Sequence, residues 1–256
     1  MSIPFAKMHG LGNDFVVIDE TERSHPITPS LVQTLANRRT GIGFDQLLIL
    51  EPSQRADFFM KIFNSDGSEA LQCGNGLRCI ALFIKKNNLS VKKQLTIETA
   101  SGIASLEIQE DLIRVNMGTP RFIPVDIPHI TAISMGNPHA IMMVSSLDDY
   151  PVFETAKQLS LHSAFPDGIN VGFMQIVNAD YIRLCTIERG AGKTPSCGSN
   201  AAAAVVAGIQ EGKLNHAVTI ELPYGNLGVE WSGLLDAPVF LSGPAAWVFS
   251  GHIHKI

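Results

Sequence analysis

The sequence lacks several features that would each point to a class of protein. Only 17% of its 256 residues are charged and the formal net charge is −5, so no broad basic face for nucleic acid is expected. Apolar residues make up 45% of the chain, which fits a folded protein rather than a disordered one. A chain of this length forms one large or two ordinary domains and buries a sizeable core without disulfide bonds.

Long apolar segments and leader patterns are also missing. The longest apolar run, at 201–209, is far shorter than the roughly 20 residues that cross a bilayer. The first residues, MSIPFAKMHGLGNDF, lack the basic region and apolar stretch of a secretory signal. We therefore expect a cytoplasmic protein without membrane contact, in which thiols stay reduced.

Cysteine is scarce, and its spacing excludes the common metal motifs. None of Cys73, Cys79, Cys185 and Cys197 forms a Cys-x-x-Cys pair, and no histidines have zinc-finger spacing, so we predict no metal site. Cys79 and Cys185 lie in apolar runs, where a free cysteine usually acts as a small buried hydrophobe. The segment GAGKT at 190–194 resembles part of a phosphate-binding loop, but Ile187 stands where that motif needs glycine. We therefore expect no nucleotide cofactor.

What the chain does contain is an internal repeat. The segments CGNGLRCIALFI, from Cys73, and CGSNAAAAVVAG, from Cys197, each join Cys-Gly and a polar residue to an apolar stretch that predicts a buried helix. The offset between them, 197 − 73 = 124, aligns further residues, and an offset of 123 aligns TIETASGIASLEI with TIELPYGNLGVEW. The pairs aligned by 124 are Asn13 with Asn137, Gln46 with Asn170, and Asn64 with Glu188.

The repeat predicts two α/β domains of similar structure. We expect the first at 1–118 together with 243–256 and the second at 119–242. Helices are expected at 30–37, 75–87, 154–161 and 199–211. Short β-rich strands are expected at 15–18, 47–50, 58–63, 95–98, 105–108, 113–117, 140–144, 173–177, 181–186, 218–221, 228–231 and 247–250.

A cysteine at each predicted helix start points to acid–base chemistry. The start of a helix carries unpaired N–H groups and partial positive charge, which lower the pKa of a thiol and bind carboxylates. Gly74 and Gly198 lack a Cβ atom, so a ligand could approach the backbone closely. If the two helix starts face each other across an interdomain cleft, one thiolate removes a proton from carbon and the other thiol returns one to the opposite face. This inverts a stereocentre without a cofactor, while the helix starts stabilise the carbanion through its carboxylate.

Six segments together resemble the diaminopimelate epimerase family, with a match from Lys7 to Ile253. They are MHGLGNDFVVID, NSDGSEALQCGNGLRC, MGNPHA, INVGF, IERGAGKTPSCGSNAAAA and SGPAAWVFSG. The resemblance implies an α/β (α+β) fold of two pseudo-symmetric domains, each a curved, mostly antiparallel sheet wrapped around a central helix, with the active site in the interdomain cleft. It implies a cofactor-independent homodimeric epimerase that interconverts LL- and meso-diaminopimelate in lysine and peptidoglycan precursor biosynthesis.

The resemblance also implies roles for single residues. Cys73 and Cys197 match the acid–base pair, and His139 and Glu188 match polar residues that support the thiols. From the sequence alone a lone histidine such as His139 is more often structural. The residues that match the grip on the reacting carboxylate are Gly74, Asn75, Gly198 and Ser199. Those that match other substrate contacts are Asn13, Gln46, Asn64, Asn137, Asn170, Glu188 and Arg189.

The chain departs from the family pattern mainly around its second cysteine. Lys193 replaces a usual glutamate and Asn200 a usual glycine, while Phe249 replaces a tyrosine implicated in the family's dimer. We expect Lys193 to favour the thiolate form of Cys197, provided that its side chain points that way.

Two alternatives to a diaminopimelate epimerase stay open. One is a related cofactor-independent racemase of another amino acid, such as histidine, and the other is a catalytically silent amino-acid-binding protein. Asn64, Glu188 and Arg189 favour diaminopimelate, because an amino acid with a single zwitterionic end would leave them unpaired.

Overall fold

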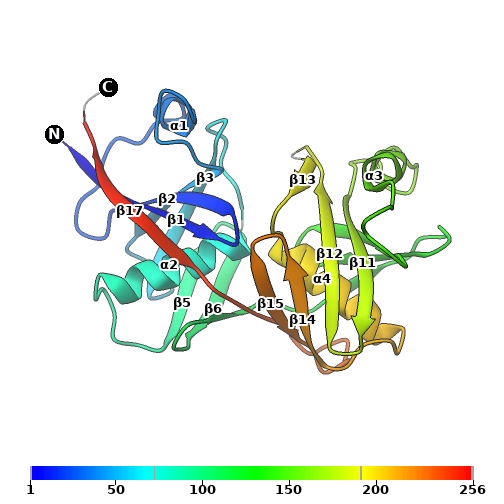
Figure 1. Cartoon of the computed structure of the whole chain (residues 1–256). Coiled ribbons are helices and arrows are strands. Elements are labelled where there is room, and N and C mark those ends of the chain that lie inside the picture. The colour runs from blue at the N-terminus through cyan, green and yellow to red at the C-terminus, as the bar shows by residue number, and fades with distance from the viewer. Residues whose placement is uncertain (1, 72, 191, 255–256) are drawn as a thin grey trace. The chain divides into compact units, whose positions relative to one another are not determined.

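The computed structural model describes residues 2–71, 73–190 and 192–254. The chain divides into two compact units, which we call unit 1 (Met1–Val115 with Pro244–Ile256) and unit 2 (Asn116–Gly243) (Figure 1). No helix in the described ranges is long and apolar enough to cross a membrane.

Unit 1 contains a mostly antiparallel sheet. Its strands are β1 (Ile3–Gly10), β2 (Asn13–Asp19), β3 (Gln46–Glu51), β4 (Phe58–Asn64), β5 (Gln94–Thr99), β6 (Gly102–Ile108), β7 (Ile113–Asn116) and β17 (Ala246–Ile253). They pair in the order β17-β1-β2-β3-β4-β5-β6-β7, with only β2–β3 and β4–β5 parallel. Because β17 pairs with β1, the end of the chain belongs to the same sheet as its beginning.

Unit 2 repeats this arrangement. Its strands are β8 (Arg121–Ile123), β9 (Ile130–Ser134), β10 (Pro138–Met143), β11 (Asn170–Asn178), β12 (Tyr181–Glu188), β13 (Gly192–Thr194), β14 (Ala217–Leu222), β15 (Gly225–Glu230) and β16 (Phe240–Gly243). The order is β8-β9-β10-β11-β12-β14-β15-β16, again with the third and fifth pairs parallel, and the short β13 pairs with the end of β12.

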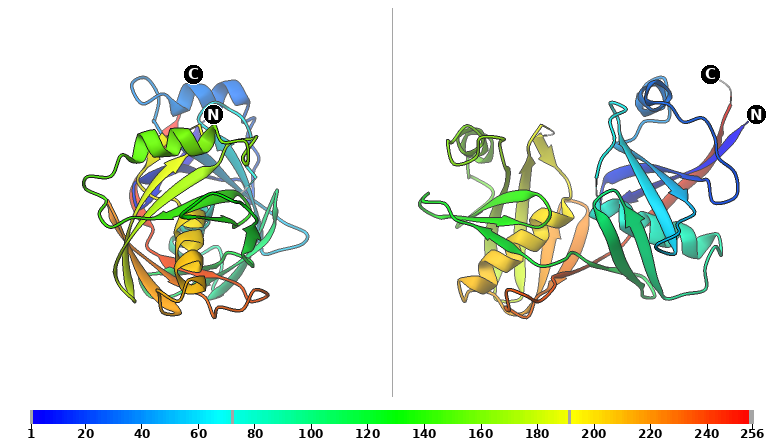
Figure 2. Two further views of the ribbon diagram at one scale, coloured as in Figure 1. Left: turned by 90° about the vertical axis from the view of Figure 1, so that its right-hand side faces the viewer. Right: turned by 180° about the vertical axis from the view of Figure 1, so that it is seen from behind.

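Each sheet packs around a long helix. In unit 1 this is α2 (Gly74–Lys86), which contacts β1, β2, β3, β6 and β17, and in unit 2 it is α4 (Gly198–Gln210). Alanine and valine residues occupy every side of α4, so the helix is apolar and buried all round, and strands of unit 2 surround it (Figure 2). Lysines in the last turn of α2 interact favourably with the negative end of the helix dipole.

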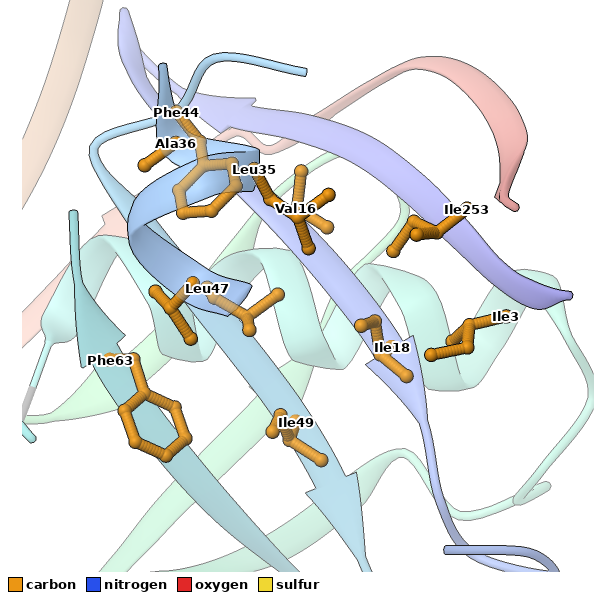
Figure 3. Close-up of a cluster of buried hydrophobic side chains, with 11 residues drawn as sticks. Ile3, Val16, Ile18, Leu35, Ala36, Phe44, Leu47, Ile49, Phe63 and Ile253 are labelled. Atoms are coloured by element: carbon orange, nitrogen blue, oxygen red, sulfur yellow. The ribbon is translucent and has the colours of Figure 1, made fainter. Parts of the chain in front are cut away.

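A shorter helix covers the outer face of each sheet, α1 (Pro29–Ala36) in unit 1 and α3 (Val152–Ser160) in unit 2. Leu35 of α1 packs with Val16 and Ile18 of β2 and with Leu47 and Ile49 of β3, residues that alternate along their strands (Figure 3). Helices on both faces explain why β2 and β3 contain continuous buried apolar runs.

The predicted class, a mixed α/β chain with mostly antiparallel strands, is confirmed. Each of the four predicted helices lies within two residues of an observed one. The strands β1, β8, β9, β13 and β16 were not predicted. The sequence of β1, IPFAKMHG, has no run of β-branched or aromatic residues and includes a proline, and its pairing with β17 joins distant parts of the chain.

The offset of 124 also relates the observed elements of the two units. Added to α2 (Gly74–Lys86), it gives the bounds of α4 (Gly198–Gln210). Strand register follows the same rule, since Phe15 lies opposite Gln46 in unit 1 and His139 lies opposite Asn170 in unit 2.

Candidate functional site

The predicted site residues of unit 1 gather at one end of its sheet. Asn13 begins β2, Gln46 begins β3 and Asn64 ends β4. Because β2 and β3 are parallel and β4 is antiparallel to them, all three residues lie at the same end. Helix α2 begins there too, since Asn75 in its first turn donates from Nδ2 to Asn13 Oδ1 at 3.1 Å.

Cys73 is the N-cap of α2. Its Sγ accepts a hydrogen bond from the Gly76 amide at 3.3 Å and lies 4.0 Å from Asn13 Oδ1. The same helix carries Arg78, whose guanidinium is fully buried and whose Nη1 and Nη2 atoms have no hydrogen-bond partner in the described residues. Burial lowers the pKa of Arg78, while negative charge at Cys79 or Cys73 acts in the opposite direction. This half of the site therefore holds a buried positive charge close to its thiol.

A tight turn and an ion cluster hold Asn13. Leu11 and Gly12 form the two-residue turn between β1 and β2, with φ values of 52° and 88°. Positive φ at both positions is typical of a tight hairpin turn, and glycine adopts it readily at the second position. Asn13 Nδ2 donates to Asp45 Oδ2 at 2.9 Å. Arg38 binds that carboxylate at 2.8 Å and binds Asp14 through both Nη atoms, at 2.9 and 2.7 Å.

Asp14 is the centre of this cluster. Lys7 Nζ lies 2.5 Å from its Oδ2, the oxygen that Arg38 Nη1 also binds. Burial alone would raise the pKa of Asp14, but the hydrogen bonds and charges of Arg38 and Lys7 lower it well below its usual range. The cluster therefore stays charged in neutral solution and fixes the strand end that carries Asn13.

Side-chain amides link the other two polar residues of unit 1. Gln46 Nε2 donates to Asn64 Oδ1 at 2.9 Å, and Asn64 Nδ2 donates to Ser68 Oγ at 3.0 Å. The structure thus connects Asn13 with Cys73 and Asn75, and Gln46 with Asn64, as two neighbouring groups on adjacent strands.

In unit 2, Cys197 is the N-cap of α4 and only 9% exposed. Its Sγ lies 3.5 Å from Ser199 Oγ. Burial, together with the charge and hydrogen bond of the Glu188 carboxylate, raises the pKa of the Cys197 thiol to about 12. The expectation of a lowered pKa at this helix start is wrong for Cys197, because desolvation outweighs the favourable N–H groups.

Glu188 ends β12 at the position equivalent to Asn64, and Thr194 Oγ1 donates to its Oε1 at 2.8 Å. The main influences on the pKa of Cys197 are burial, Glu188, Ser199 and Asn200, so the predicted effect of Lys193 is not among the large ones. Its charge lowers the pKa of Cys185 instead, although burial leaves that pKa raised overall. The reason is the strand register, which sets Lys193 opposite Ile187 and so on the sheet face of Cys185.

His139 is fully buried behind Asn137. Its Nε2 lies 3.0 Å from Asn137 Oδ1, and its Nδ1 lies 3.1 Å from Asn200 Nδ2. Asn200 Oδ1 in turn accepts a hydrogen bond from Thr186 Oγ1 at 3.2 Å. Burial lowers the pKa of His139 to about 3, so the imidazole is neutral in neutral solution.

The side chain of Asn170 binds the backbone of Arg189. Asn170 is buried and its Oδ1 accepts the Arg189 amide at 2.9 Å. The Arg189 guanidinium is exposed and donates to the Asp167 carbonyl. Gly168, with φ of 72°, makes room for this side chain, since a Cβ atom there would lie 2.9 Å from Arg189 Cδ.

Sequence reasoning missed some of the residues that hold this site. Asp45, Ser68 and Thr194 each bind a predicted site residue, and Thr186 binds Asn200; none of the four has a counterpart in the repeat that could have revealed it. Asn200 was visible as a departure from the family pattern, although its hydrogen bonds were not. Among the described residues, no group of three or more His, Cys, Asp or Glu side chains is arranged to hold a metal ion.

The model of the diaminopimelate epimerase family matches residues 5–123 and 131–248 of this chain. The chain is 46% identical to diaminopimelate epimerases from Chromobacterium violaceum and Stutzerimonas stutzeri, each alignment covering 99% of both proteins. The chain belongs to the diaminopimelate epimerase family. The predicted resemblance, and with it the prediction of an epimerase, an isomerase, is confirmed.

Solved structures of other proteins share the fold at low identity. A phenazine biosynthesis protein of the PhzF family from Bacillus anthracis matches with a TM-score of 0.75 and 18% identity over the whole of both chains. A hydroxyproline epimerase from Agrobacterium vitis matches with a TM-score of 0.70 and 14% identity, covering 98% of this chain and 92% of that one. The same fold thus occurs in a phenazine biosynthesis protein and in a hydroxyproline epimerase.

Proposed function

We propose that the chain interconverts LL- and meso-diaminopimelate by a cofactor-independent two-base mechanism, with one thiol from each unit. Its membership of the diaminopimelate epimerase family supports the substrate, and the position of a cysteine at the start of each central helix supports the chemistry. Units 1 and 2 serve as the two epimerase domains, and each contributes one thiol to the reaction. The product is a precursor of lysine and of peptidoglycan.

The first step removes the proton from the α-carbon of the substrate. The Cys73 thiolate takes the proton and becomes a thiol, while the electron pair of the broken C–H bond is delocalised into the carboxylate. The first N–H groups of both helices, at Gly74 and Asn75 and at Gly198 and Ser199, bind this carboxylate and stabilise its growing charge. The Cys197 thiol then gives its proton to the opposite face and becomes a thiolate, which completes the inversion.

Charge differences between the half-sites support this assignment of the thiolate in the resting enzyme. Both thiols accept a backbone N–H, from Gly76 and from Asn200, but Cys73 also caps the helix that carries the buried cation Arg78. Cys197 is buried beside the Glu188 carboxylate, which favours the protonated form. In the reverse direction the same steps run with the two thiols exchanged.

The remaining predicted residues bind the substrate. Asn13 and Asn137 contact the reacting end, and His139 supports the second half-site. The distal amino-acid end is bound by a set of polar groups that suits a second ammonium and carboxylate. These groups come from Gln46, Asn64, Asn170, Glu188 and Arg189.

We further propose that two copies form a homodimer and that the enzyme works in the cytoplasm. Exposed Val248 and Phe249 lie on β17, and Phe249 contacts Phe5 edge to face with ring centroids 6.0 Å apart. The mechanism needs reduced thiols, which the cytoplasm maintains. Sedimentation equilibrium of the wild type and of Val248→Glu tests the dimer, and a monomeric wild type would refute it.

Proton exchange in D₂O tests the main proposal. With reductant present, LL-diaminopimelate should gain deuterium at one α-carbon and form the meso isomer, as measured by NMR and chiral separation. Histidine and glutamate serve as controls for a related racemase and should not exchange. Exchange with a control amino acid alone would replace the substrate, and absence of exchange with all three would favour a silent binding protein.

A further inference from the structure

One buried chain of hydrogen bonds in unit 2 includes a residue with no assigned role. Thr186 Oγ1 donates to Asn200 Oδ1, Asn200 Nδ2 lies 3.1 Å from His139 Nδ1, and His139 Nε2 lies 3.0 Å from Asn137 Oδ1. Asn200 and His139 have no exposed surface. Asn137, at the end of the chain, is exposed.

The direction of these hydrogen bonds follows from their first member. The Thr186 hydroxyl donates, so the Asn200 oxygen accepts and its NH₂ group faces His139. His139 Nδ1 must then accept, which leaves the ring proton on Nε2, where it donates to Asn137 Oδ1. Asn137 therefore has its oxygen occupied and its NH₂ group turned away from the histidine.

Comparison with unit 1 indicates that this arrangement is particular to unit 2. Under the offset of 124, His139 corresponds to Phe15 and Asn200 to Gly76, so neither side chain has a polar counterpart. In unit 1 a strand residue, Leu48, fills the space beside a helix glycine, whereas in unit 2 a helix residue, Asn200, fills the space beside a strand glycine. A Cβ atom on Gly76 would meet Leu48 at 3.2 Å, whereas a Cβ atom on Gly172, the counterpart of Leu48, would lie 2.4 Å from Asn200 Oδ1.

The two asparagine residues consequently present opposite groups. Asn13 Nδ2 is bound to Asp45, and its oxygen lies toward Cys73. Asn137 Oδ1 is bound to His139, and its Nδ2 makes no hydrogen bond within the described residues. An amide oxygen suits an ammonium group, and an amide NH₂ group suits a carboxylate.

We propose that Asn200 is a positioning residue that fixes the tautomer of His139 and thereby holds the Asn137 NH₂ group ready to donate to a carboxylate oxygen of the substrate. The identity of the carboxylate ligand rests on the proposed function, whereas the direction of the hydrogen bonds does not depend on it. Asn200, which stands where the family usually has glycine, would thus act in the half-site of Cys197.

Two substitutions separate positioning from space filling. In Asn200→Asp the side chain keeps its size, but both oxygens accept, so His139 Nδ1 must carry a proton. In Asn200→Gly the NH₂ donor to His139 Nδ1 is lost, but no acceptor replaces it. His139 can therefore keep its proton on Nε2 and its hydrogen bond to Asn137. We expect kcat/KM for diaminopimelate to fall in the order wild type, Asn200→Gly, Asn200→Asp, with a loss of about 10- to 100-fold in the last. If Asn200 only fills space, the isosteric Asp variant will be the more active of the two.

Nitrogen-15 NMR of the imidazole supplies a readout that a packing role would not move. The wild type should carry the His139 proton on Nε2 and Asn200→Asp should carry one on Nδ1, with the signals assigned by their loss in His139→Gln. A wild-type proton on Nδ1, or an Asp variant with unchanged kcat/KM, would overturn the proposal. These spectra need no turnover, so a wild type inactive on diaminopimelate would refute the proposed function while the hydrogen-bond direction is still decided.

Discussion

Units 1 and 2 share strand order and register but hold their equivalent asparagines by different means. In unit 1, Asn13 depends on Asp45 and on the ion cluster of Asp14, Arg38 and Lys7. In unit 2, the positions equivalent to Asp14 and Asp45 are Pro138 and Ile169, which carry no charge. There, a neutral buried network anchored at Asn200 replaces the cluster. The backbone arrangement is thus common to both units, whereas the supporting contacts are specific to each.

The charges beside the two thiols differ in the same manner. Arg78 of unit 1 corresponds to Ala202 of unit 2, and Asn64 corresponds to Glu188. One thiol therefore lies near a buried cation and the other beside a carboxylate. The proposed two-base reaction needs one thiolate and one thiol at the start, and this asymmetry favours the thiolate at Cys73 and the thiol at Cys197.

The largest expected effect is in the reactivity of the two thiols. Iodoacetamide at pH 8 should modify Cys73 at least about 100-fold faster than Cys197, because only a thiolate reacts and the pKa of Cys197 is raised to about 12. Peptide mass spectrometry over time gives both rates, with buried Cys79 as an internal reference. Equal alkylation rates for Cys73 and Cys197 would show that the two thiols do not differ in protonation.

Glu188→Gln should make the half-sites more alike. Loss of the carboxylate charge lowers the pKa of Cys197, so its alkylation becomes faster, although burial keeps the pKa above its ordinary value. The kcat/KM for diaminopimelate should fall by about 10- to 100-fold because the proposed charged contact with the substrate is lost. Glu154→Gln, on the exposed face of α3, is the matched control. An unchanged alkylation rate in Glu188→Gln would show that Glu188 does not act on this thiol.

Asp14→Asn breaks the ion cluster that only unit 1 possesses. We expect the free energy of unfolding to fall by about 2 kcal/mol at pH 7. Because the folded-state pKa of Asp14 lies below the unfolded value of about 3.9, its contribution is present above that value and is lost as pH falls toward the folded pKa. The difference in melting temperature from the wild type should therefore narrow below about pH 4 but persist at pH 3, because the folded-state pKa lies lower still. A difference independent of pH, or one shared by exposed Asp111→Asn, would contradict this explanation.

The smallest effect concerns the outer helices. Thr28 caps α1 by accepting the Leu31 amide at 3.2 Å, whereas α3 starts at Pro151 with no side-chain cap. Thr28→Ala should cost about 1 kcal/mol in urea unfolding. Pro151→Ala removes no hydrogen bond and should cost less, and the reverse ranking would show that the cap contributes little.

Much of the fold followed from local patterns. The apolar runs after each Cys-Gly predicted α2 and α4 to within one residue at each end, because burial on all sides leaves a continuous signal. The strand β1 was missed, since its pairing with β17 depends on residues at the opposite end of the chain. Local propensity carries no information about such a pairing.

The candidate site was predicted as a set of residues but not as an electrostatic arrangement. The repeat aligned Asn13 with Asn137, but nothing in it showed that one presents an oxygen and the other an NH₂ group. The pKa of Cys197 was predicted in the wrong direction, because a sequence shows the helix start but not the depth of burial. These properties depend on contacts between elements far apart in the chain.

Alanine substitution at each cysteine tests whether each unit supplies one indispensable thiol. Inversion of LL- and of meso-diaminopimelate would be followed by chiral separation for Cys73→Ala, Cys197→Ala and the matched control Cys185→Ala. We expect inversion to fall by roughly 10³-fold or more in the first two variants, since no other group serves the vacated face, and to stay near wild type in the third. Inversion at a near wild-type rate in either Cys73→Ala or Cys197→Ala would contradict the two-thiol mechanism.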